Sequence, residues 1–267
     1  MLKTVRLIGL PTDSHSSFLR GPAQAPGAIR AALASEHGNR ATELGAELGL
    51  DIALEDLGDL NLKESAADFD CIRAAVAAAA QGGATPLFLG GDHMVTYPIL
   101  AGLAEVHGPV NILHFDAHPD LYDDFEGDPL SHASPFARIM ERGLASRLVQ
   151  VGIRTLNGHC REQARRFGVE IIEMRHFAHN AVPIPAAPLY VSIDLDALDP
   201  AFAPGVSHHE PGGLSVREIL SVLHRIEVPV VGADVVEYNP TRDINGMTAV
   251  VAAKLVKELA SLAAGRS

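Results

Sequence analysis

The chain has 267 residues, of which 47% are hydrophobic and 20% are charged, and its formal net charge is −12. This length is enough for a large hydrophobic core and most simply forms a single domain, 1–267. The acidic balance argues against nucleic acid as a partner, because nucleic-acid binding needs a basic surface. A membrane partner is not expected either, since the most apolar stretch, 74–80, is far too short to span a bilayer.

Strand-like and helical patterns alternate along the chain. This alternation predicts βαβ units, and therefore a mainly parallel sheet with helices on both faces. No internal repeat and no linker composition interrupts the pattern. The predicted strands lie near 5–9, 52–56, 86–89, 110–115, 148–153, 169–172, 189–194 and 229–235. The predicted helices cover 26–33, 66–80, 97–105, 134–142, 216–225 and 247–263.

The first predicted strand also bears on location. Residues 5–9 alternate as a strand does and Pro11 follows at once, so the N-terminus shows no signal-peptide pattern. The chain has two cysteines, Cys71 and Cys160, and neither stands in a metal-binding or redox spacing. Both fit free thiols in a reducing compartment. We therefore expect a cytoplasmic protein.

Polar residues follow three of the predicted strands. Gly90-Gly-Asp-His93 comes after 86–89, residues 114–120 read His-Phe-Asp-Ala-His-Pro-Asp, and residues 192–199 read Ser-Ile-Asp-Leu-Asp-Ala-Leu-Asp. Open parallel sheets carry their active sites at the carboxyl ends of their strands. Three polar clusters at equivalent strand ends therefore predict one shared site.

The chemistry of these clusters indicates metal ions. Side chains two residues apart on an extended segment point to the same side, so Asp116, His118 and Asp120 converge, as do Asp194 and Asp196. Neither cluster contains a Lys or Arg to compensate the negative charge, which leaves a bound cation as the natural partner.

Carboxylate oxygens with a minority of imidazole nitrogens and no thiolate suit manganese better than structural zinc. With His93 there are six candidate ligands. This is too many for one catalytic ion that must keep open positions, but it is reasonable for two ions that share a bridging water.

Two further residues belong to the same predicted edge. Glu237 follows the last strand and has no basic neighbour in sequence, so it could hold a cationic group of a substrate. His132 stands at a loop–helix junction after the 114–120 cluster, where a histidine could shuttle protons. His114 lies inside the strand pattern, and we assign it to the core or to a supporting position.

These motifs resemble those of the ureohydrolases, the family of arginases and agmatinases. The resemblance covers nearly the whole chain and is strongest to plant-type arginases. It is carried by the segments 90–93, 115–120, 192–204 and 234–240, and the plant-type match by 16–22, 125–127, 131–134, 136–141, 205–208, 210–215 and 247–254.

The resemblance implies a three-layer α/β/α fold, with a central, mainly eight-stranded parallel sheet, and two Mn²⁺ per chain. It implies attack of a metal-bridging hydroxide on the guanidino group of L-arginine, giving urea and L-ornithine. His132 would transfer protons and Glu237 would bind the guanidinium, with Asp120 counted beside them as catalytic. Relatives are often trimers or hexamers, so a homo-oligomer is expected. The implied metal ligands are His93, Asp116, His118, Asp120, Asp194 and Asp196.

The substrate is less constrained than the reaction. The loop 120–132 lacks the asparagine and serine with which animal arginases bind the amino-acid end, and Tyr122 takes the first of these positions. Thr155 stands where animal arginases carry an acid. Agmatine, or another guanidino compound, is therefore the alternative substrate. The residues expected to face the far end of the substrate are Tyr122, Thr155, Asn157 and His208, with His209 at the mouth.

Two other functions are open to this fold. A zinc amide hydrolase of the deacetylase kind needs one metal and would leave Asp120 and Glu237 without a role. A non-catalytic binding or regulatory relative has no need of an intact ligand set. Metal content, together with urea release from a panel of guanidino compounds, separates the three.

Overall fold

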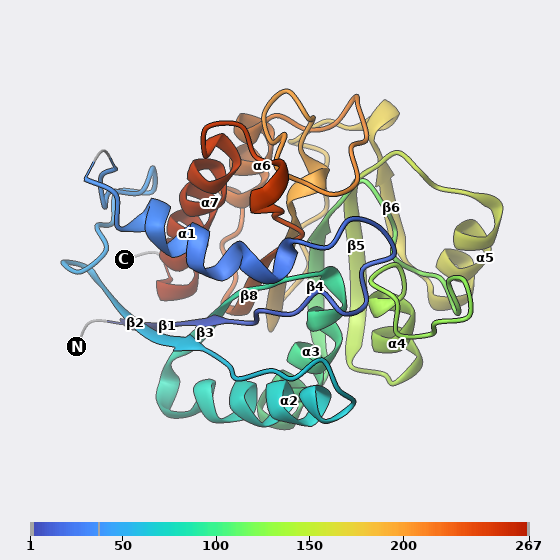
Figure 1. Cartoon of the computed structure of the whole chain (residues 1–267), viewed down its shortest axis with the longest axis horizontal. Coiled ribbons are helices and arrows are strands. Elements are labelled where there is room, and N and C mark those ends of the chain that lie inside the picture. Colours follow the sequence, from blue (N-terminus) through green and yellow to red (C-terminus); the bar gives the residue numbers. More distant parts are fainter. Residues whose placement is uncertain (1–2, 37, 266–267) are drawn as a thin grey trace.

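The chain folds around a sheet of eight parallel strands in the computed structural model, which describes residues 3–36 and 38–265 (Figure 1). The strand order is β2-β1-β3-β8-β7-β4-β5-β6. Each predicted strand is present, and the predicted parallel sheet is confirmed. The strands are β1 (Lys3–Gly9), β2 (Ile52–Asp59), β3 (Thr85–Leu89), β4 (Val110–Phe115), β5 (Ala145–Ile153), β6 (Glu170–Glu173), β7 (Leu189–Asp194) and β8 (Val230–Val236).

Helices cover both faces of the sheet, as the predicted three-layer fold requires (Figure 1). On one face α1 and α6 both contact α7, and on the other α3 contacts α2 and α4, with α5 beside α4. The α-helices are α1 (Ala25–Leu33), α2 (Ala67–Ala79), α3 (Thr96–His107), α4 (Pro135–Glu141), α5 (Gly158–Phe167), α6 (Val216–Leu223) and α7 (Met247–Ala264). The short 3₁₀ helices are η1 (Pro22–Gln24), η2 (Gln81–Gly83), η3 (His93–Val95), η4 (Met174–His176), η5 (Leu195–Ala197) and η6 (Pro240–Arg242).

The central strands supply a hydrophobic core on each face of the sheet. Successive side chains of a strand point to opposite faces, so a fully buried strand must be apolar throughout. On β3, Leu87 and Leu89 lie in the core under α1, α6 and α7, whereas Phe88 lies in the core under α2, α3 and α4. On β4, Leu113 and Ile112 divide in the same way. This explains why these strands read as continuous apolar runs.

Helix α5 was missed by the sequence prediction. Its sequence is mostly polar and starts with a glycine, and its narrow apolar stripe consists of Cys160, Ala164 and Phe167. The helix begins because the side chain of Asn157 accepts a hydrogen bond from the backbone N of Cys160 at 2.9 Å. It ends at Gly168, whose φ of 68° lies in the left-handed region.

The topology places four polar motifs side by side. Strands β3, β8, β7 and β4 are consecutive in the sheet, and all four run in the same direction. The segments that follow them contain His93, Glu237, Asp196 and Asp116, respectively. Their carboxyl ends therefore meet at one edge. In the described part of the chain, no helix is long and apolar enough to span a membrane.

Candidate metal centre and active-site cavity

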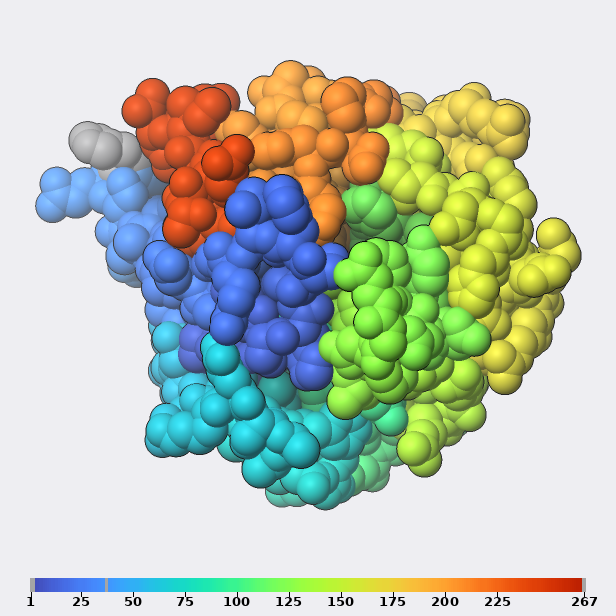
Figure 2. Space-filling view, turned by 45° about the vertical axis from the view of Figure 1, so that its right-hand side comes forward, coloured from blue at the N-terminus to red at the C-terminus, as the bar shows by residue number. Residues whose placement is uncertain are grey.

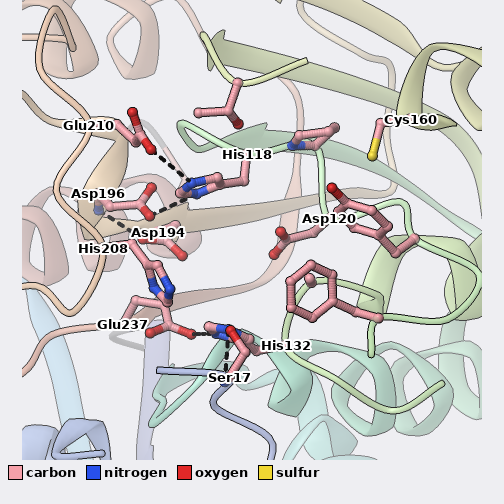
Figure 3. Close-up of a pocket in the computed structure, with 15 residues that line it drawn as sticks. Ser17, His118, Asp120, His132, Cys160, Asp194, Asp196, His208, Glu210 and Glu237 are labelled. Atoms are coloured by element: carbon pink, nitrogen blue, oxygen red, sulfur yellow. Dashed lines mark hydrogen bonds and ion pairs between the residues drawn. The ribbon is translucent and has the colours of Figure 1, made fainter. Parts of the chain in front are cut away.

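The edge where these strands end opens onto a cavity of about 210 Å³ (Figure 3). In the space-filling view, the N-terminal segment, the loop after β4 and the loop after β7 meet around a recess on one face of the molecule (Figure 2). All of the predicted ligands lie near this recess. Those that line the cavity directly are His118, Asp120, Asp194 and Asp196.

Three carboxylates converge on one nitrogen of His93. Nδ1 of His93 lies 3.0 Å from Asp120, 3.1 Å from Asp116 and 3.2 Å from Asp194, measured to Oδ2 of each. The His93 side chain is buried, and its Nδ1 has no hydrogen-bond partner. A buried nitrogen without a partner, facing three carboxylate oxygens, fits a metal ligand better than it fits a structural histidine.

The other nitrogen of His93 is held by a buried hydrogen-bond chain. Nε2 lies 3.0 Å from Oγ of Ser192, and that hydroxyl donates to Oδ1 of Asp234 at 2.6 Å. Tyr190 and Thr96 also donate to Asp234, through hydroxyls at 2.6 and 2.7 Å from Oδ2. Asp234 thus holds the Ser192 hydroxyl, and Ser192 holds the His93 ring so that its Nδ1 faces the carboxylates.

A second group lies around His118. Its Nδ1 is 2.9 Å from Oδ2 of Asp196 and 3.4 Å from Oδ1 of Asp116. Asp116 therefore faces His93 with one oxygen and His118 with the other. Two imidazoles joined through one carboxylate form the arrangement expected of two adjacent ions.

The charges in this cluster require a cation. Burial raises the pKa of Asp194, and the charges on Asp196 and Asp116 raise it further. Burial and the charge on Asp116 likewise raise the pKa of Asp120. Each shift records a buried carboxylate that its surroundings destabilise, and positive ions at this point would relieve it. The donor set, carboxylates and imidazoles without a thiolate, fits manganese.

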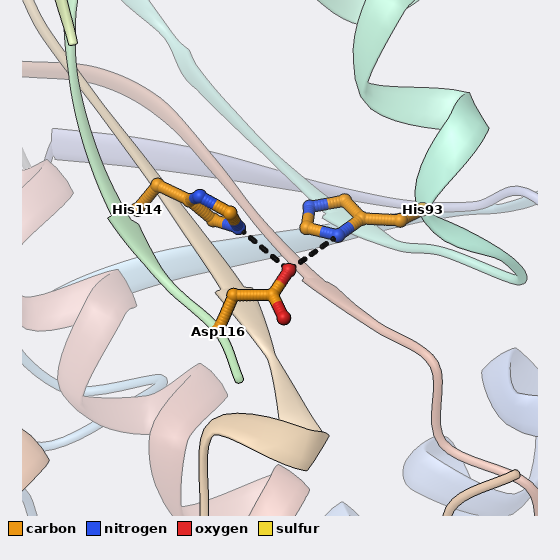
Figure 4. A group of neighbouring side chains, drawn as sticks. All are labelled: His93, His114 and Asp116. Carbon is orange, nitrogen blue, oxygen red and sulfur yellow. Dashed lines mark hydrogen bonds and ion pairs between the residues drawn. The ribbon is translucent and has the colours of Figure 1, made fainter. Parts of the chain in front are cut away.

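His114 lies beside His93, and both rings point at Oδ2 of Asp116 (Figure 4). Gln150 donates its Nε2–H₂ both to Nδ1 of His114, at 3.1 Å, and to the carbonyl of Pro119, at 2.6 Å. Nδ1 of His114 is therefore the acceptor, which leaves the proton on Nε2 to donate to Oδ2 of Asp116 at 2.9 Å. This agrees with the supporting position predicted for His114.

Two residues of the cavity hold strained backbone conformations. Asp120 has φ 49° and Glu237 has φ 62°, in the left-handed region that residues with a Cβ rarely occupy. Both side chains are buried. Such strain persists only where the surrounding structure enforces it, and it concentrates at functional sites.

Glu237 and His132 form a buried pair. Oε1 of Glu237 accepts from Nδ1 of His132 at 2.7 Å and from the backbone N of His93 at 2.9 Å. Burial lowers the pKa of His132, but the charge of Glu237, the hydrogen bond to it and the charges of Asp92 and Asp120 together outweigh burial and raise that pKa to about 9. Burial raises the pKa of Glu237, but the charge of His132 and the hydrogen bond from it lower the pKa overall. Glu237 is therefore a carboxylate, with Oε2 not engaged by either partner.

Of the residues predicted to face the far end of the substrate, some line the cavity and others lie outside it. Tyr122, Thr155 and His208 line the cavity. Asn157 does not: its Oδ1 caps α5, and its Nδ2 donates to the hydroxyl of Tyr122 at 2.6 Å. His209 also lies outside, with its Nε2 2.7 Å from the carbonyl of Pro204. Asn157 can act on a substrate through Tyr122.

The His208 ring stands at the centre of the cavity wall. Its centroid lies 5.3 Å from that of His132, 5.5 Å from that of Phe18 and 5.9 Å from that of His118. Burial lowers the pKa of His208, and the positive charge of His132 lowers it further. The lowered pKa favours the neutral form of this ring, which lies between His118 and His132.

Several residues that line the cavity were not identified from the sequence, among them Ser17 and Glu210. Ser17 reaches the cavity from the N-terminal segment, and Glu210 lies with Oε1 3.9 Å from Nε2 of His118. Both stood within segments that match plant-type arginases. Neither follows a strand or has a motif spacing of its own, so only the fold brings them to the site.

Comparison with known proteins agrees with this geometry. The sequence model of the arginase family matches residues 3–261. Arginase 1, mitochondrial, of Arabidopsis thaliana is 51% identical over 96% of this chain and 80% of its own length. The solved structure of arginase from Medicago truncatula superposes with a TM-score of 0.91 at 46% identity, covering 98% of this chain and 87% of that one. These matches confirm the predicted resemblance and fold.

The comparison also corrects one prediction. Arginase 2 of Arabidopsis thaliana, 49% identical over 97% of this chain and 80% of its own length, is named chloroplastic/mitochondrial. With the mitochondrial name of Arginase 1, this contradicts the expected cytoplasmic location. That expectation rested on the missing signal-peptide pattern and on two free thiols, and it was wrong because neither feature carries information about organelle targeting.

Proposed function

This chain belongs to the arginase family and is a ureohydrolase, and we propose that it hydrolyses L-arginine to urea and L-ornithine with two Mn²⁺ ions. The observation that carries the two-ion proposal is the position of Asp116, whose two oxygens face two different imidazoles. The proposed ligands are His93, Asp116, His118, Asp120, Asp194 and Asp196.

When bound, the ions would supply Lewis-acid activation of water at neutral pH. The chain's own contribution is to hold the ligands at that point. Ser192 and Asp234 orient His93, and His114 and Gln150 orient Asp116. Partners of this kind fix the ligating atom and the ring orientation, and their loss typically weakens metal binding ~10–100-fold.

Glu237 is proposed to bind the guanidinium of the substrate. Its Oε1 is occupied by His132 and His93, so Oε2 is the oxygen that can accept from the substrate. A charge-assisted hydrogen bond to a planar cation fixes the angle at which its central carbon is presented. The strained backbone of Glu237 keeps this carboxylate pointed into the cavity.

His132 is proposed to protonate the departing amine. It is buried beside Glu237 and lines the same cavity, so a guanidinium held by Glu237 would lie next to the ring. Proton transfer to the amine nitrogen accompanies breakage of its bond to the guanidino carbon, and the bonding electrons leave with the amine.

Agmatine remains the second candidate because of one feature of the cavity. No lysine or arginine is among the described residues that line it, so no fixed cation is available for the carboxylate of arginine. Tyr122 and Thr155 offer hydroxyls instead. Agmatine, which lacks that carboxylate, would therefore lose little binding free energy relative to arginine.

The competing zinc amide hydrolase is disfavoured by the same contacts. A single ion at His118 would leave the three carboxylates around His93 without a cation. A non-catalytic role is disfavoured because the intact set of proposed ligands lies together at one edge of the sheet.

Two measurements on the purified protein test the proposal. Elemental analysis should give two manganese ions per chain, and urea release should be fastest with arginine among arginine, agmatine, guanidinobutyrate and guanidine. One tightly bound ion with full activity would overturn the two-ion centre. Release of urea only from another compound of the panel would overturn the arginine assignment.

A further inference from the structure

Ser17 closes a hydrogen-bonded chain with His132 and Glu237 (Figure 3). Oγ of Ser17 lies 2.8 Å from Nε2 of His132, and the backbone N of Ser17 lies 3.2 Å from the same nitrogen. On the other side of the ring, Nδ1 faces Glu237. The imidazole is therefore held at both nitrogens, from two distant parts of the chain.

The three contacts define which nitrogen can carry the proton in the neutral ring. A backbone N–H can only donate, so in this arrangement Nε2 of His132 is an acceptor. The single ring proton then lies on Nδ1 and is donated to Glu237. The hydroxyl of Ser17 differs from the amide, because it can donate to a bare Nε2 and can also turn and accept from a protonated one.

The segment that carries Ser17 is anchored on both sides. Before it, the carbonyl of His15 accepts from the backbone N of His132 at 3.0 Å. After it, the carbonyl of Leu19 accepts from Oγ of Ser207 at 2.8 Å and from Nδ2 of Asn239 at 3.3 Å. Ser17 itself is exposed, whereas His132 is buried. The segment thus fixes the backbone of His132 as well as its ring.

We propose that Ser17 is a positioning residue for His132, and that its hydroxyl keeps the ring in one orientation while Nε2 gains and loses the proton. This inference rests on the proton-transfer role proposed for His132. In the neutral ring the Ser17 hydroxyl donates to Nε2. In the imidazolium it accepts from Nε2–H, which the fixed amide of Ser17 cannot do.

Removing the hydroxyl should therefore penalise the protonated ring. In Ser17→Ala the imidazolium would face only the N–H of residue 17, so the acid form that delivers the proton would be less stable. The substitution leaves the other groups that interact electrostatically with His132 unchanged. These groups are Glu237, Asp92, Asp120 and His208. We expect kcat for arginine to fall roughly tenfold, the worth of one hydrogen bond, with KM within about twofold.

Three variants test this on the manganese-loaded enzyme. Ser17→Ala should lose turnover, Ser17→Thr should retain most of it because it keeps the hydroxyl, and Ser14→Ala should match wild type. Ser14 is the matched control, because it is an exposed serine of the same segment and contacts Thr12 at 3.3 Å rather than His132. Wild-type kcat in Ser17→Ala, or an equal loss in Ser17→Thr, would overturn the proposal.

A second measurement does not depend on activity. Nitrogen-15 NMR of histidine-labelled protein at a pH above the raised pKa of His132, with His132 assigned through its loss in His132→Ala, should show the neutral ring protonated at Nδ1. A neutral ring protonated at Nε2 would overturn the proposal even if the enzyme hydrolyses arginine. If the wild-type enzyme released no urea, the proposed function would be wrong. The tautomer of the His132 ring would still test the role of Ser17.

Discussion

Nδ1 of His132 lies 2.7 Å from Oε1 of Glu237, although the two residues are 105 positions apart in the chain. His132 comes from the loop before α4, and Glu237 follows β8. The group proposed to bind the guanidinium and the group proposed to move the proton are thus attached to each other. Substitutions of the two should nevertheless have different kinetic effects.

His132→Ala should lower kcat by ~10²–10⁴-fold while KM changes little, because general acid catalysis acts in the transition state. Steady-state urea release with arginine measures both constants. His176→Ala, an exposed histidine, is the control. A raised KM with unchanged kcat would make His132 a binding residue.

Glu237→Gln should lower kcat/KM by at least ~10²-fold, because the neutral amide loses the charge-assisted hydrogen bond and the alignment that it gives. Manganese content should stay at the wild-type value. Glu126→Gln, on the exposed loop beyond Tyr122, serves as the control. Should the variant keep its activity and lose manganese, Glu237 would belong with the metal ligands.

Asp120→Asn or Asp194→Asn should lose at least one of the two manganese ions. Each carboxylate lies within 3.2 Å of Nδ1 of His93 and supplies charge that the other ligands cannot replace. Elemental analysis after gel filtration measures this, with Asp123→Asn on the neighbouring surface as the control. Two ions retained in both variants would contradict the ligand assignment.

Asp13 should make stability depend on pH in the acid range. Burial raises the pKa of this carboxyl, but hydrogen bonds from the backbone N of Gly21 and the guanidinium of Arg20 outweigh burial and lower it overall. A carboxylate with a lowered folded pKa stabilises the fold above its unfolded pKa of ~3.9, and the stabilisation is lost as pH falls through the folded pKa.

Asp13→Asn should therefore destabilise the protein by roughly 1–3 kcal/mol at pH 7. The difference from wild type should be constant down to about pH 5 and should narrow below about pH 4. Urea unfolding at several pH values measures it, and Asp51→Asn is an exposed control. A difference that widens in acid would contradict this role.

The clustering of the proposed metal ligands could be predicted because the order of strands and polar motifs follows from local rules. Period-two spacing predicted that Asp116, His118 and Asp120 share one side of an extended segment. The segment instead bends after β4, with Asp120 at φ 49°, and the parallel strands bring the side chains to one edge. Those rules need only the order of residues within a few positions. The same reasoning found the strands, whose apolar runs follow from burial on both faces.

Ser17 and Gln150 could not be found in this way. Ser17 contacts a residue 115 positions away and Gln150 one 36 positions away, and neither contact has a signal in its own neighbourhood. Asn157 was assigned to the substrate, yet its side chain caps α5, a helix that the sequence prediction missed. Contacts between loops depend on how the sheet twists and which helices cover it, which local patterns do not specify.

Arginine should be preferred over agmatine by only ~10–10³-fold in kcat/KM. The two compounds differ by one carboxylate, and strong discrimination requires site groups that are left unpaired when it is absent. The described lining of the cavity has no lysine or arginine for this purpose. Tyr122 accepts from Nδ2 of Asn157 and could turn its hydroxyl proton from Cys160 to a carboxylate, but a neutral donor contributes less than a cation. Tyr122→Phe should therefore reduce the preference for arginine more than it reduces the rate with agmatine. Side-by-side kcat/KM values for wild type and Tyr122→Phe decide this. Agmatine exceeding arginine in wild type would overturn the substrate assignment, and equal losses with both compounds in Tyr122→Phe would exclude Tyr122 as the discriminating residue.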